Sequence, residues 1–559
     1  MTTAAGETQL SSDQSQVPGF AAWLSVGTRT WRLASLLVAL VVLAPVLVVS
    51  ASWLVPATDV WRHLAQTVLP ELLRNTVVLV LGVGAGVLVL GVALAWLVAL
   101  FEFPGRRFFE WALMLPLAIP AYVFAFVAVG LLDFSGPVQS WLRVHVGAVW
   151  FPPIRSAGGV IAVMVLAFYP YVYMLARAAF LAQGWGMLDT GRAFGLTPAR
   201  AFFRVALPVA RPAIAAGVAI ALMETLADFG AVAVFNYDTF TTAIYKAWQG
   251  LFSLPAAAQL SSLLLLFVAL ALFGEQQLRG RARYHLTLKH GREQRAKLHG
   301  RRAAAAFGSC AFVTLLAFVI PVVQLVIWAV DAARTDLDAR YLRFIGNTLM
   351  LGGIAAVGTT FAAVVIAYTY RLKPDRFIRA AARCATLGYA LPGSVLAVGI
   401  MISFIWVDRH LLVPALSIFG VPVAPVLAGS LLAMLLAYGV RFMAVAHGPV
   451  DSAFERIKPS LLQAARSLGA SNREILWRVS VPLLRTGILS SGLLVFVEVM
   501  KEMPATLLLR PFGWDTLATR IFEMTSEGEW QRAALPAVAL VLAGLIPVIL
   551  LVRRAKPSH

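Results

Sequence analysis

Four carboxylates lie within long apolar stretches of this sequence, where charged side chains are rare. Glu224 and Asp228 are four residues apart, and Glu498 and Glu502 repeat this spacing later in the chain. A spacing of four residues places two side chains on one face of an α-helix. Because a carboxylate in lipid is costly, these side chains should face the protein interior or a wet cavity. They could bind a cation there through hard oxygen ligands.

Two interpretations of these carboxylates are open. In the functional one, Glu224, Asp228, Glu498 and Glu502 converge from two parts of the chain, line a translocation path and act as transient metal ligands. In the structural one, Glu498 pairs with Lys501, three residues away, and Glu224 bonds to the backbone of a neighbouring helix. A sulfate or molybdate path would be expected to use Arg side chains or helix N-termini. The carboxylates therefore favour a cation.

The stretches that position these residues are long enough to cross a membrane. Hydrophobic residues make up 60% of the 559 residues and charged residues 13%, against roughly 25% charged in soluble proteins. A run of about 20 apolar residues spans a bilayer core. About twelve such runs predict an all-α polytopic integral membrane protein, with approximate bounds 34–54, 75–100, 111–132, 159–182, 212–235, 256–274, 304–329, 347–370, 384–406, 422–445, 484–508 and 532–552. Counted from Pro212, Glu224 would lie about 18 Å and Asp228 about 24 Å along the fifth helix.

The chain has a formal net charge of +19, and the placement of its basic residues indicates the membrane topology. The basic residues lie between apolar runs and form no soluble basic domain, which argues against a nucleic-acid partner. They gather in alternate connections, most densely between Glu275 and Arg302, where nine Arg or Lys accompany two Glu. This positive-inside pattern predicts that both termini are cytoplasmic. The polar first thirty residues contain no basic segment leading into a short apolar one, so no cleavable signal peptide is predicted.

The sequence contains an internal repeat. Asn75-Thr76 recurs as Asn347-Thr348 at an offset of 272 residues, and the two carboxylate pairs recur at an offset of 274. We therefore divide the chain into a polar tail (1–30), a first transmembrane half (31–274), a basic cytoplasmic linker (275–303) and a second transmembrane half (304–559). Since the offset contains an even number of crossings, the halves have the same orientation. A path between the halves is the natural consequence.

A polar loop between the fourth and fifth apolar runs is also repeated. In the second half it extends from Pro459 to Pro482, with leucines at helical spacing before Gly469 and a second helical pattern after it. The pattern predicts two short amphipathic helices around a glycine turn. Such a structure could dock onto a soluble, two-fold partner or lie flat on the lipid surface.

These loops resemble the EAA loop of type I ABC-importer permeases. The matching residues are Asp189, Gly191, Gly195 and Pro208 in the first half and Gln463, Ala464, Ala465, Gly469 and Pro482 in the second. In that family the loop contains a coupling helix that fits a groove on the ATP-hydrolysing subunit. The resemblance implies two cytoplasmic ABC ATPase subunits and a periplasmic substrate-binding protein as partners. The chain departs from the family at the leading Glu, which is Asp189 or Gln463 here, and at the paired alanines, which are Thr190 and Gly191 in the first half.

Two further segments resemble ferric-iron permeases of this family: Met223 to Trp248 and Glu498 to Glu523. This resemblance implies import of Fe(III) across the bacterial inner membrane by alternating access. Thiamine and polyamine permeases are close neighbours, so their cationic cargoes stay open. A proton-coupled secondary transporter is the alternative of another class, and it would need no ATPase.

The sequence has no phosphate-binding loop of the Gly-Lys-Ser/Thr type, because none of the seven lysines follows a glycine. We therefore expect a transport subunit that is not itself an enzyme and binds no cofactor, with ATP and Mg²⁺ on a separate partner. Tyr169, Tyr171 and Tyr173 could line a path, but they are interpreted as aromatic anchors near a membrane interface, which are commoner. Arg441, placed near the inner end of the tenth run, is expected to extend its charge toward water.

Overall fold

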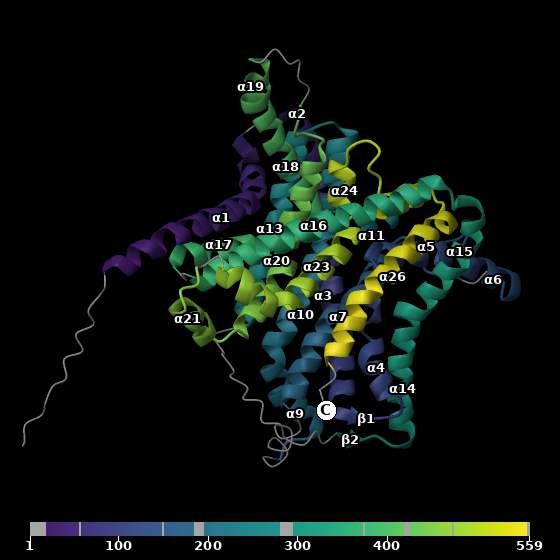
Figure 1. Ribbon diagram of the computed structural model, residues 1–559. Helices are drawn as coiled ribbons and strands as arrows, with labels where there is room; N and C mark the ends of the chain where they lie inside the picture. The colour runs from purple at the N-terminus through teal and green to yellow at the C-terminus, as the bar shows by residue number, and fades with distance from the viewer. Residues whose placement is uncertain are drawn as a thin grey trace, which may run out of the picture.

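The computed structural model describes residues 18–54, 58–147, 150–183, 195–279, 295–372, 375–418, 425–471 and 474–555. Within these ranges, twelve helices are long and apolar enough to cross a membrane, which confirms the all-α polytopic fold. α2 and α19 lie at one end of the molecule and α9, β1 and β2 lie at the other (Figure 1). We call these the α19 end and the linker end.

The first half consists of the elements that precede the linker. Its elements are α1 (Pro18–Ser50), η1 (Ala51–Leu54), α2 (Thr58–His63), η2 (Leu64–Val68), α3 (Leu69–Leu100), β1 (Phe101–Glu102), α4 (Arg106–Ala112), η3 (Leu115–Ala118), α5 (Ala121–Leu132), α6 (Pro137–His145), α7 (Ala157–Gln183), α9 (Pro198–Ala201), η4 (Phe202–Ala206), α10 (Leu207–Ala227), α11 (Gly230–Val234), α12 (Phe240–Tyr245), η5 (Lys246–Gly250) and α13 (Leu254–Arg279).

The second half repeats this order. Its elements are β2 (Ala296–Lys297), α14 (Gly300–Thr314), η6 (Leu315–Val319), α15 (Ile320–Asp336), α16 (Ala339–Leu372), α17 (Arg376–Thr386), η7 (Leu387–Ala390), α18 (Gly393–Val407), η8 (Asp408–Leu412), α19 (Val413–Ser417), α20 (Leu431–Glu455), α21 (Pro459–Ser467), η9 (Ile475–Ser480), α23 (Val481–Lys501), α24 (Pro504–Leu509), α25 (Leu517–Ser526) and α26 (Trp530–Ala555). Thus α16, α20 and α23 correspond to α3, α7 and α10.

Small residues allow the helices of the first half to approach closely. α3 packs along α7, and Gly86 and Gly91 lie on the contacting face. A Cβ atom on Gly86 would come within 2.3 Å of Val165, and one on Gly91 within 2.7 Å of Val172. Glycines at such contacts are typical of membrane helices, where close van der Waals packing takes the place of the hydrophobic effect.

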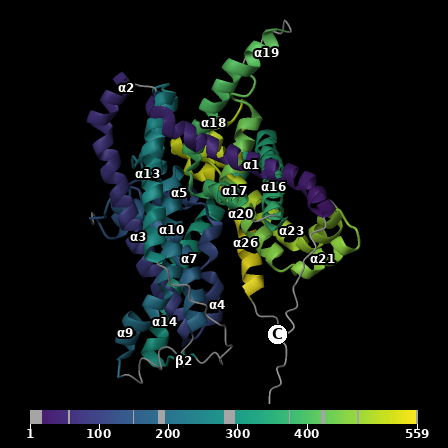
Figure 2. The ribbon, with the colours of Figure 1, turned by 90° about the vertical axis from the view of Figure 1, so that its left-hand side faces the viewer.

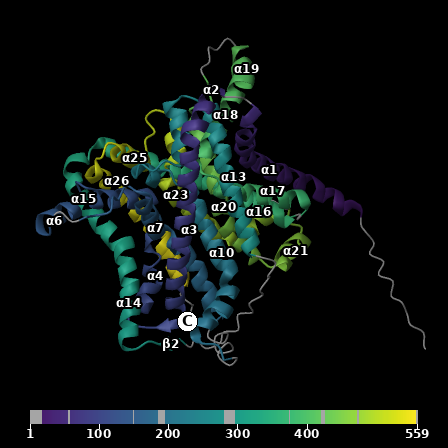
Figure 3. The ribbon, with the colours of Figure 1, turned by 180° about the vertical axis from the view of Figure 1, so that it is seen from behind.

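The first helices of the two halves are exchanged. α1 packs against α16, α17 and α18 of the second half, which it crosses in Figure 2. Conversely, α14 contacts α4 and α15 contacts α5 of the first half, and the view from behind shows α14 beside α4 (Figure 3). β2, at the end of the linker, pairs in parallel with β1 of the first half. Each half therefore holds the other in place.

Several predicted spans have the wrong bounds, and the errors recur in both halves. The third and ninth spans begin at Ala121 and Gly393, about ten residues later than the predicted 111 and 384. Pro120 and Pro392, directly before these helices, have extended ψ angles near 141°. Proline cannot donate a backbone hydrogen bond, so it separates each span from the short helices before it. The tenth span likewise begins at Leu431, not at 422.

The fifth and eleventh spans end earlier than predicted. α10 ends at Ala227 and α23 at Lys501, whereas the apolar runs continue to 235 and 508. The next residues, Asp228 and Glu502, have extended ψ angles of 129° and 114°. The short helices α11 and α24 then follow. The carboxylates therefore mark breaks in the helices, and hydropathy alone does not reveal such breaks.

Candidate functional site

A cavity of about 290 Å³ lies between the two halves. All four carboxylates singled out in the sequence line it, together with Arg441 and Lys501. Four acidic and two basic side chains leave a formal surplus of two negative charges. The sequence therefore singled out the four acidic residues and named Lys501 as a partner of Glu498, but it did not place Arg441 in this cavity.

The first-half carboxylates have different surroundings. Glu224 lies within α10, one turn before its end. Asp228 lies beyond the end of α10, and its Oδ1 accepts hydrogen bonds from the backbone N–H groups of Ala231 (2.9 Å) and Val232 (3.3 Å) at the start of α11. Both side chains line the same cavity, as their spacing predicts, but α10 ends before Asp228, so the apolar run does not continue as one helix to residue 235.

The second half repeats this arrangement. Glu502 follows the end of α23, and its Oε1 accepts a hydrogen bond of 3.1 Å from the backbone N–H of Ala505 in α24. Its Oε2 lies 3.0 Å from Nε of Arg441. Glu498, one turn earlier in α23, lies 3.4 Å from Nζ of Lys501. The structural interpretation of Glu498 as a partner of Lys501 is thus confirmed.

Arg441 does not extend toward water, and the prediction that it does is wrong. It lies eleven residues into α20, and its side chain is 12% exposed against 4% for that of Glu502. The predicted tenth span ended near Arg441 because its bounds were shifted toward the N-terminus. With the span at Leu431–Glu455, an arginine in its interior would have indicated a buried ion pair or a wet cavity.

The two halves line the cavity with equivalent positions but different charges. Arg441 corresponds to Ala167 of α7 at the offset of 274, and Lys501 corresponds to Ala227 of α10. All four of these residues line the cavity. The first half thus contributes two acids and two alanines, and the second half contributes two acids and two cations.

The carboxylates are not assembled as a metal site in this conformation. Among the residues that the structure describes, no group of three or more His, Cys, Asp and Glu side chains could hold a metal ion. Asp228 and Glu502 each accept a hydrogen bond from a backbone N–H group at the start of a short helix. The expectation that all four carboxylates converge as ligands is therefore not met here, and a transient ligand role for them stays a prediction.

Aromatic and backbone contacts join the halves beside the cavity. Tyr122 Oη donates a hydrogen bond of 3.4 Å to the carbonyl of Lys501. The centroid of the Phe522 ring in the second half lies 5.3 Å from that of Phe229 and 6.0 Å from that of Tyr245, both in the first half. Tyr122 and Phe229 also line the cavity. These contacts join the two halves around the breaks that follow α10 and α23.

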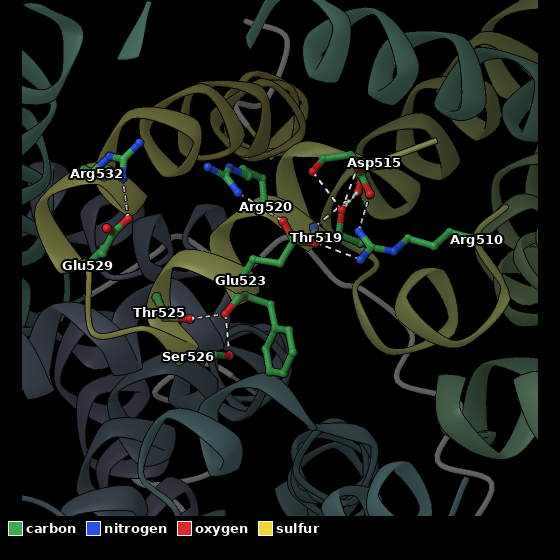
Figure 4. A network of polar contacts seen from close by, with 11 residues as sticks. Arg510, Asp515, Thr519, Arg520, Glu523, Thr525, Ser526, Glu529 and Arg532 are labelled. Atoms are coloured by element: carbon green, nitrogen blue, oxygen red, sulfur yellow. Dashed lines mark hydrogen bonds and ion pairs between the residues drawn. The ribbon is translucent and has the colours of Figure 1, made fainter. Parts of the chain in front are cut away.

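A network of ion pairs holds α25 and the adjoining chain in place. Arg510, just after α24, contacts Asp515 and lies 2.7 Å from Glu523 of α25. Glu523 also contacts Arg520 at 3.2 Å, and these groups meet in Figure 4. Glu523 follows Phe522 directly in the sequence. The network therefore fixes the segment that brings Phe522 against the first half.

The repeated loops contain the glycine turns that the sequence predicts. Gly195 and Gly469 have φ angles of +76° and +83°, which glycine adopts without the steric cost of a Cβ. Gln463, Ala464 and Ala465 lie on α21, and Pro208 and Pro482 are the second residues of α10 and α23. Asp189 and Gly191 lie outside the described residues. No contact in the structure tests the coupling role of these residues.

One detail of the second loop differs from the prediction. α21 is a separate short helix, but the helix after Gly469 is not: Ile475–Ser480 continue directly into α23. Ser471 and Glu474 form a reciprocal cap at its start, with Ser471 N–H donating to Glu474 at 3.0 Å and Glu474 N–H donating to Ser471 Oγ at 3.3 Å. The hydrogen bond from the Ser471 backbone lowers the pKa of the Glu474 carboxyl.

The three tyrosines of α7 are not interfacial anchors, so that interpretation is wrong. Tyr169 and Tyr173 are fully buried, and their hydroxyls donate to the carbonyls of Leu113 (2.9 Å) and Glu110 (3.0 Å). These hydrogen bonds fasten α4 and its C-terminal end to α7. Tyr171 lines the cavity.

Gly393, the first residue of α18, makes room for the Arg441–Glu502 pair. A Cβ atom there would lie 2.3 Å from Glu502 Oε1 and 2.9 Å from Arg441 Nη1. We expect Gly393→Ala to destabilise the protein by roughly 1–3 kcal/mol, because the ion pair must shift. Thermal unfolding in detergent measures this effect. Gly353→Ala in α16, where no atom lies within 4 Å, should be neutral or slightly stabilising, and equal melting temperatures for both variants would contradict the expectation.

A helical membrane protein with two equivalent halves and a charged cavity between them has the architecture of a permease. The sequence matches the model of the family described as binding-protein-dependent transport system inner membrane component over residues 87–280 and 359–557, once in each half. The chain belongs to this family, and it is therefore a multi-pass inner-membrane permease.

Individual relatives carry more specific names. The chain is 28% identical to the Fe(3+)-transport system permease protein FbpB 2 of Haemophilus influenzae, over 87% of this chain and 90% of that protein. It is 23% identical to the ferric transport system permease protein FbpB of Actinobacillus pleuropneumoniae, over 78% of this chain and 63% of that protein. It is 27% identical to the sulfate transport system permease protein CysT of Escherichia coli, but over 34% of this chain.

Proposed function

We propose that this permease imports ferric iron, which a periplasmic binding protein delivers and a separate ATPase drives across the membrane. The observation that carries the proposal is the cavity between the halves, in which carboxylates outnumber cations by four to two. Carboxylate oxygens are hard ligands suited to a highly charged ion. The relatives matched over most of this chain are named as ferric permeases, whereas the sulfate permease CysT covers about a third of it.

Thiamine or a polyamine is the alternative cargo that the acidic cavity also supports, since both carry positive charge. Sulfate is a weaker candidate: Arg441 and Lys501 provide positive charge, but each is already paired with a carboxylate. A proton-coupled carrier would work without a binding protein and without ATP, which a transport assay distinguishes directly.

The linker end is the cytoplasmic end in this proposal, and both chain termini would be cytoplasmic. Support comes from the basic connections, including the linker, because positive residues favour the cytoplasmic side. The loops around Gly195 and Gly469 would then be the docking sites for two ATPase subunits that hold ATP and Mg²⁺.

Each half contributes one loop and one side of the cavity, and this arrangement supports transport by alternating access. η4 and η9 connect the loops directly to α10 and α23, and these helices contain Glu224 and Glu498. A displacement of the loops when the ATPase subunits close would therefore move both carboxylates. The contacts of Tyr122 and Phe229 with the second half would break when the path opens toward the α19 end.

The test is uptake of radiolabelled Fe(III) into proteoliposomes that contain this chain and its ATPase, with the binding protein added outside and ATP enclosed. ATP-dependent iron uptake supports the proposal. Uptake of thiamine or a polyamine in place of iron would identify that molecule as the cargo, and the proposed ATP-driven mechanism would still hold. Uptake that follows a proton gradient without ATP would refute the mechanism.

The substitution Gly469→Ala tests whether the loop around Gly469 binds the ATPase. The φ angle of +83° costs an alanine roughly 1–2 kcal/mol, and no side chain crowds the position. We expect affinity for the ATPase, measured by titration in detergent, to fall about tenfold because the turn is displaced. Gly448→Ala, at an uncrowded position within α20, is the matched control. Equal ATPase affinity of the two variants would count against a coupling role for this loop.

A further inference from the structure

Lys501 adds a positive charge to the cavity in one half only. It is the last residue of α23, and its side chain is 15% exposed. Its Nζ lies 3.4 Å from Oε1 of Glu498, whose side chain is 39% exposed. The equivalent residue of the first half is Ala227, so no ammonium group accompanies Glu224 from that position. The acids are duplicated, and the lysine is not.

The two ion pairs of the cavity differ in how firmly they are held. Both oxygens of Glu502 are engaged, one by Arg441 and one by the backbone of Ala505. The Arg441–Glu502 pair is also the shorter and the more buried of the two. Glu498 and Lys501 share one longer contact, and Glu498 faces the cavity. The Lys501–Glu498 pair is therefore the one that can separate without leaving a fully buried charge.

We propose that Lys501 is a tethered counter-ion that occupies Glu498 while the cavity is empty and gives way when cationic cargo enters. This inference rests on the proposed function, in which the cargo is a cation. A carboxylate away from bulk water needs a positive partner, and the flexible four-carbon stem of lysine allows its ammonium group to move aside. Cargo and Lys501 then compete for the same carboxylate oxygen.

This competition has a direct consequence for transport. Cargo affinity is lowered by the free energy needed to separate Lys501 from Glu498. When the cargo leaves the cavity, Lys501 returns to Glu498, and this contact favours release of the cargo. Lys501 thus keeps the cavity from retaining a highly charged ion, because Lys501 and the ion compete for Glu498.

The experiment measures equilibrium retention of cargo by the full chain with its ATPase in lipid nanodiscs. The probes are radiolabelled Fe(III), supplied as its nitrilotriacetate complex, and radiolabelled sulfate in parallel. Lys501→Gln is expected to raise iron affinity about tenfold. In the Glu498→Gln background the same substitution should have no effect, because the competition is gone. Lys246→Gln, at an exposed lysine outside the cavity that pairs with Asp238, is the matched control and should match the wild type.

The outcomes separate this inference from the proposed function. If the wild type retains iron and Lys501→Gln leaves its affinity unchanged or lowers it, the iron proposal stands and the counter-ion role is overturned. An equal gain in the Glu498→Gln background also overturns that role. If the wild type retains sulfate and Lys501→Gln weakens it, Lys501 is an anion-binding residue and both proposals fail. Retention of neither probe by the wild type refutes ferric iron as a cargo that this cavity binds and overturns the inference with it.

Discussion

Replacement of both Glu224 and Glu498 by glutamine is expected to lower ATP-dependent iron uptake at least about 100-fold. These two carboxylates occupy equivalent positions of α10 and α23, one turn before the helix breaks, and both line the cavity. Each charged contact to cargo is worth roughly 1.5–3 kcal/mol, and each 1.4 kcal/mol corresponds to a factor of ten. The measurement is initial uptake into proteoliposomes with saturating binding protein.

The accompanying controls separate transport from folding and coupling. ATPase co-purification of the double variant should stay close to that of the wild type, because glutamine keeps the shape of glutamate, and its melting temperature measures the cost of leaving Lys501 without Glu498. Glu71→Gln, at an exposed position in the first turn of α3, is the matched control. Uptake by the double variant within a few-fold of the wild type would refute the assignment of these two residues to the path.

Replacement of Arg441 by methionine is expected to destabilise the protein by about 3–5 kcal/mol. The substitution leaves Glu502 without its cationic partner at a side chain that is almost fully buried, and breaking a buried pair by removal of one partner has a cost of this size. Thermal unfolding of the detergent-solubilised protein should show a clear fall in melting temperature. Lys246→Gln, at an exposed ion pair, should change stability by no more than about 1 kcal/mol.

A compensating substitution distinguishes loss of charge balance from loss of packing. Arg441→Met combined with Glu502→Gln removes both charges, and the glutamine oxygen can still accept the hydrogen bond from Ala505. We expect this double variant to recover most of the lost stability. If the double variant is as unstable as Arg441→Met alone, the cost comes from the space that arginine filled and not from an unpaired Glu502.

The sequence by itself determined the features that depend on local patterns. Apolar runs of bilayer length predicted an all-α fold with twelve spans, because each such run must satisfy its backbone hydrogen bonds within a helix. The offset of 274 residues pairs Glu224 with Glu498 and Gly195 with Gly469. Those glutamates line one cavity, and those glycines have positive φ.

Only the tertiary structure decided what depends on the end of a helix or on a partner distant in the chain. Asp228 and Glu502 lie in apolar runs, and hydropathy cannot show that the helix stops before them and that they bond to the start of the next one. Glu502, which forms an ion pair with Arg441, is 61 residues further along the chain and lies beyond the end of α23. The spacing of three residues predicted the Glu498–Lys501 pair, whereas the Arg441–Glu502 pair follows from the packing of α20 against α23 and α24, because Coulomb interactions across space leave no periodic signal in the sequence.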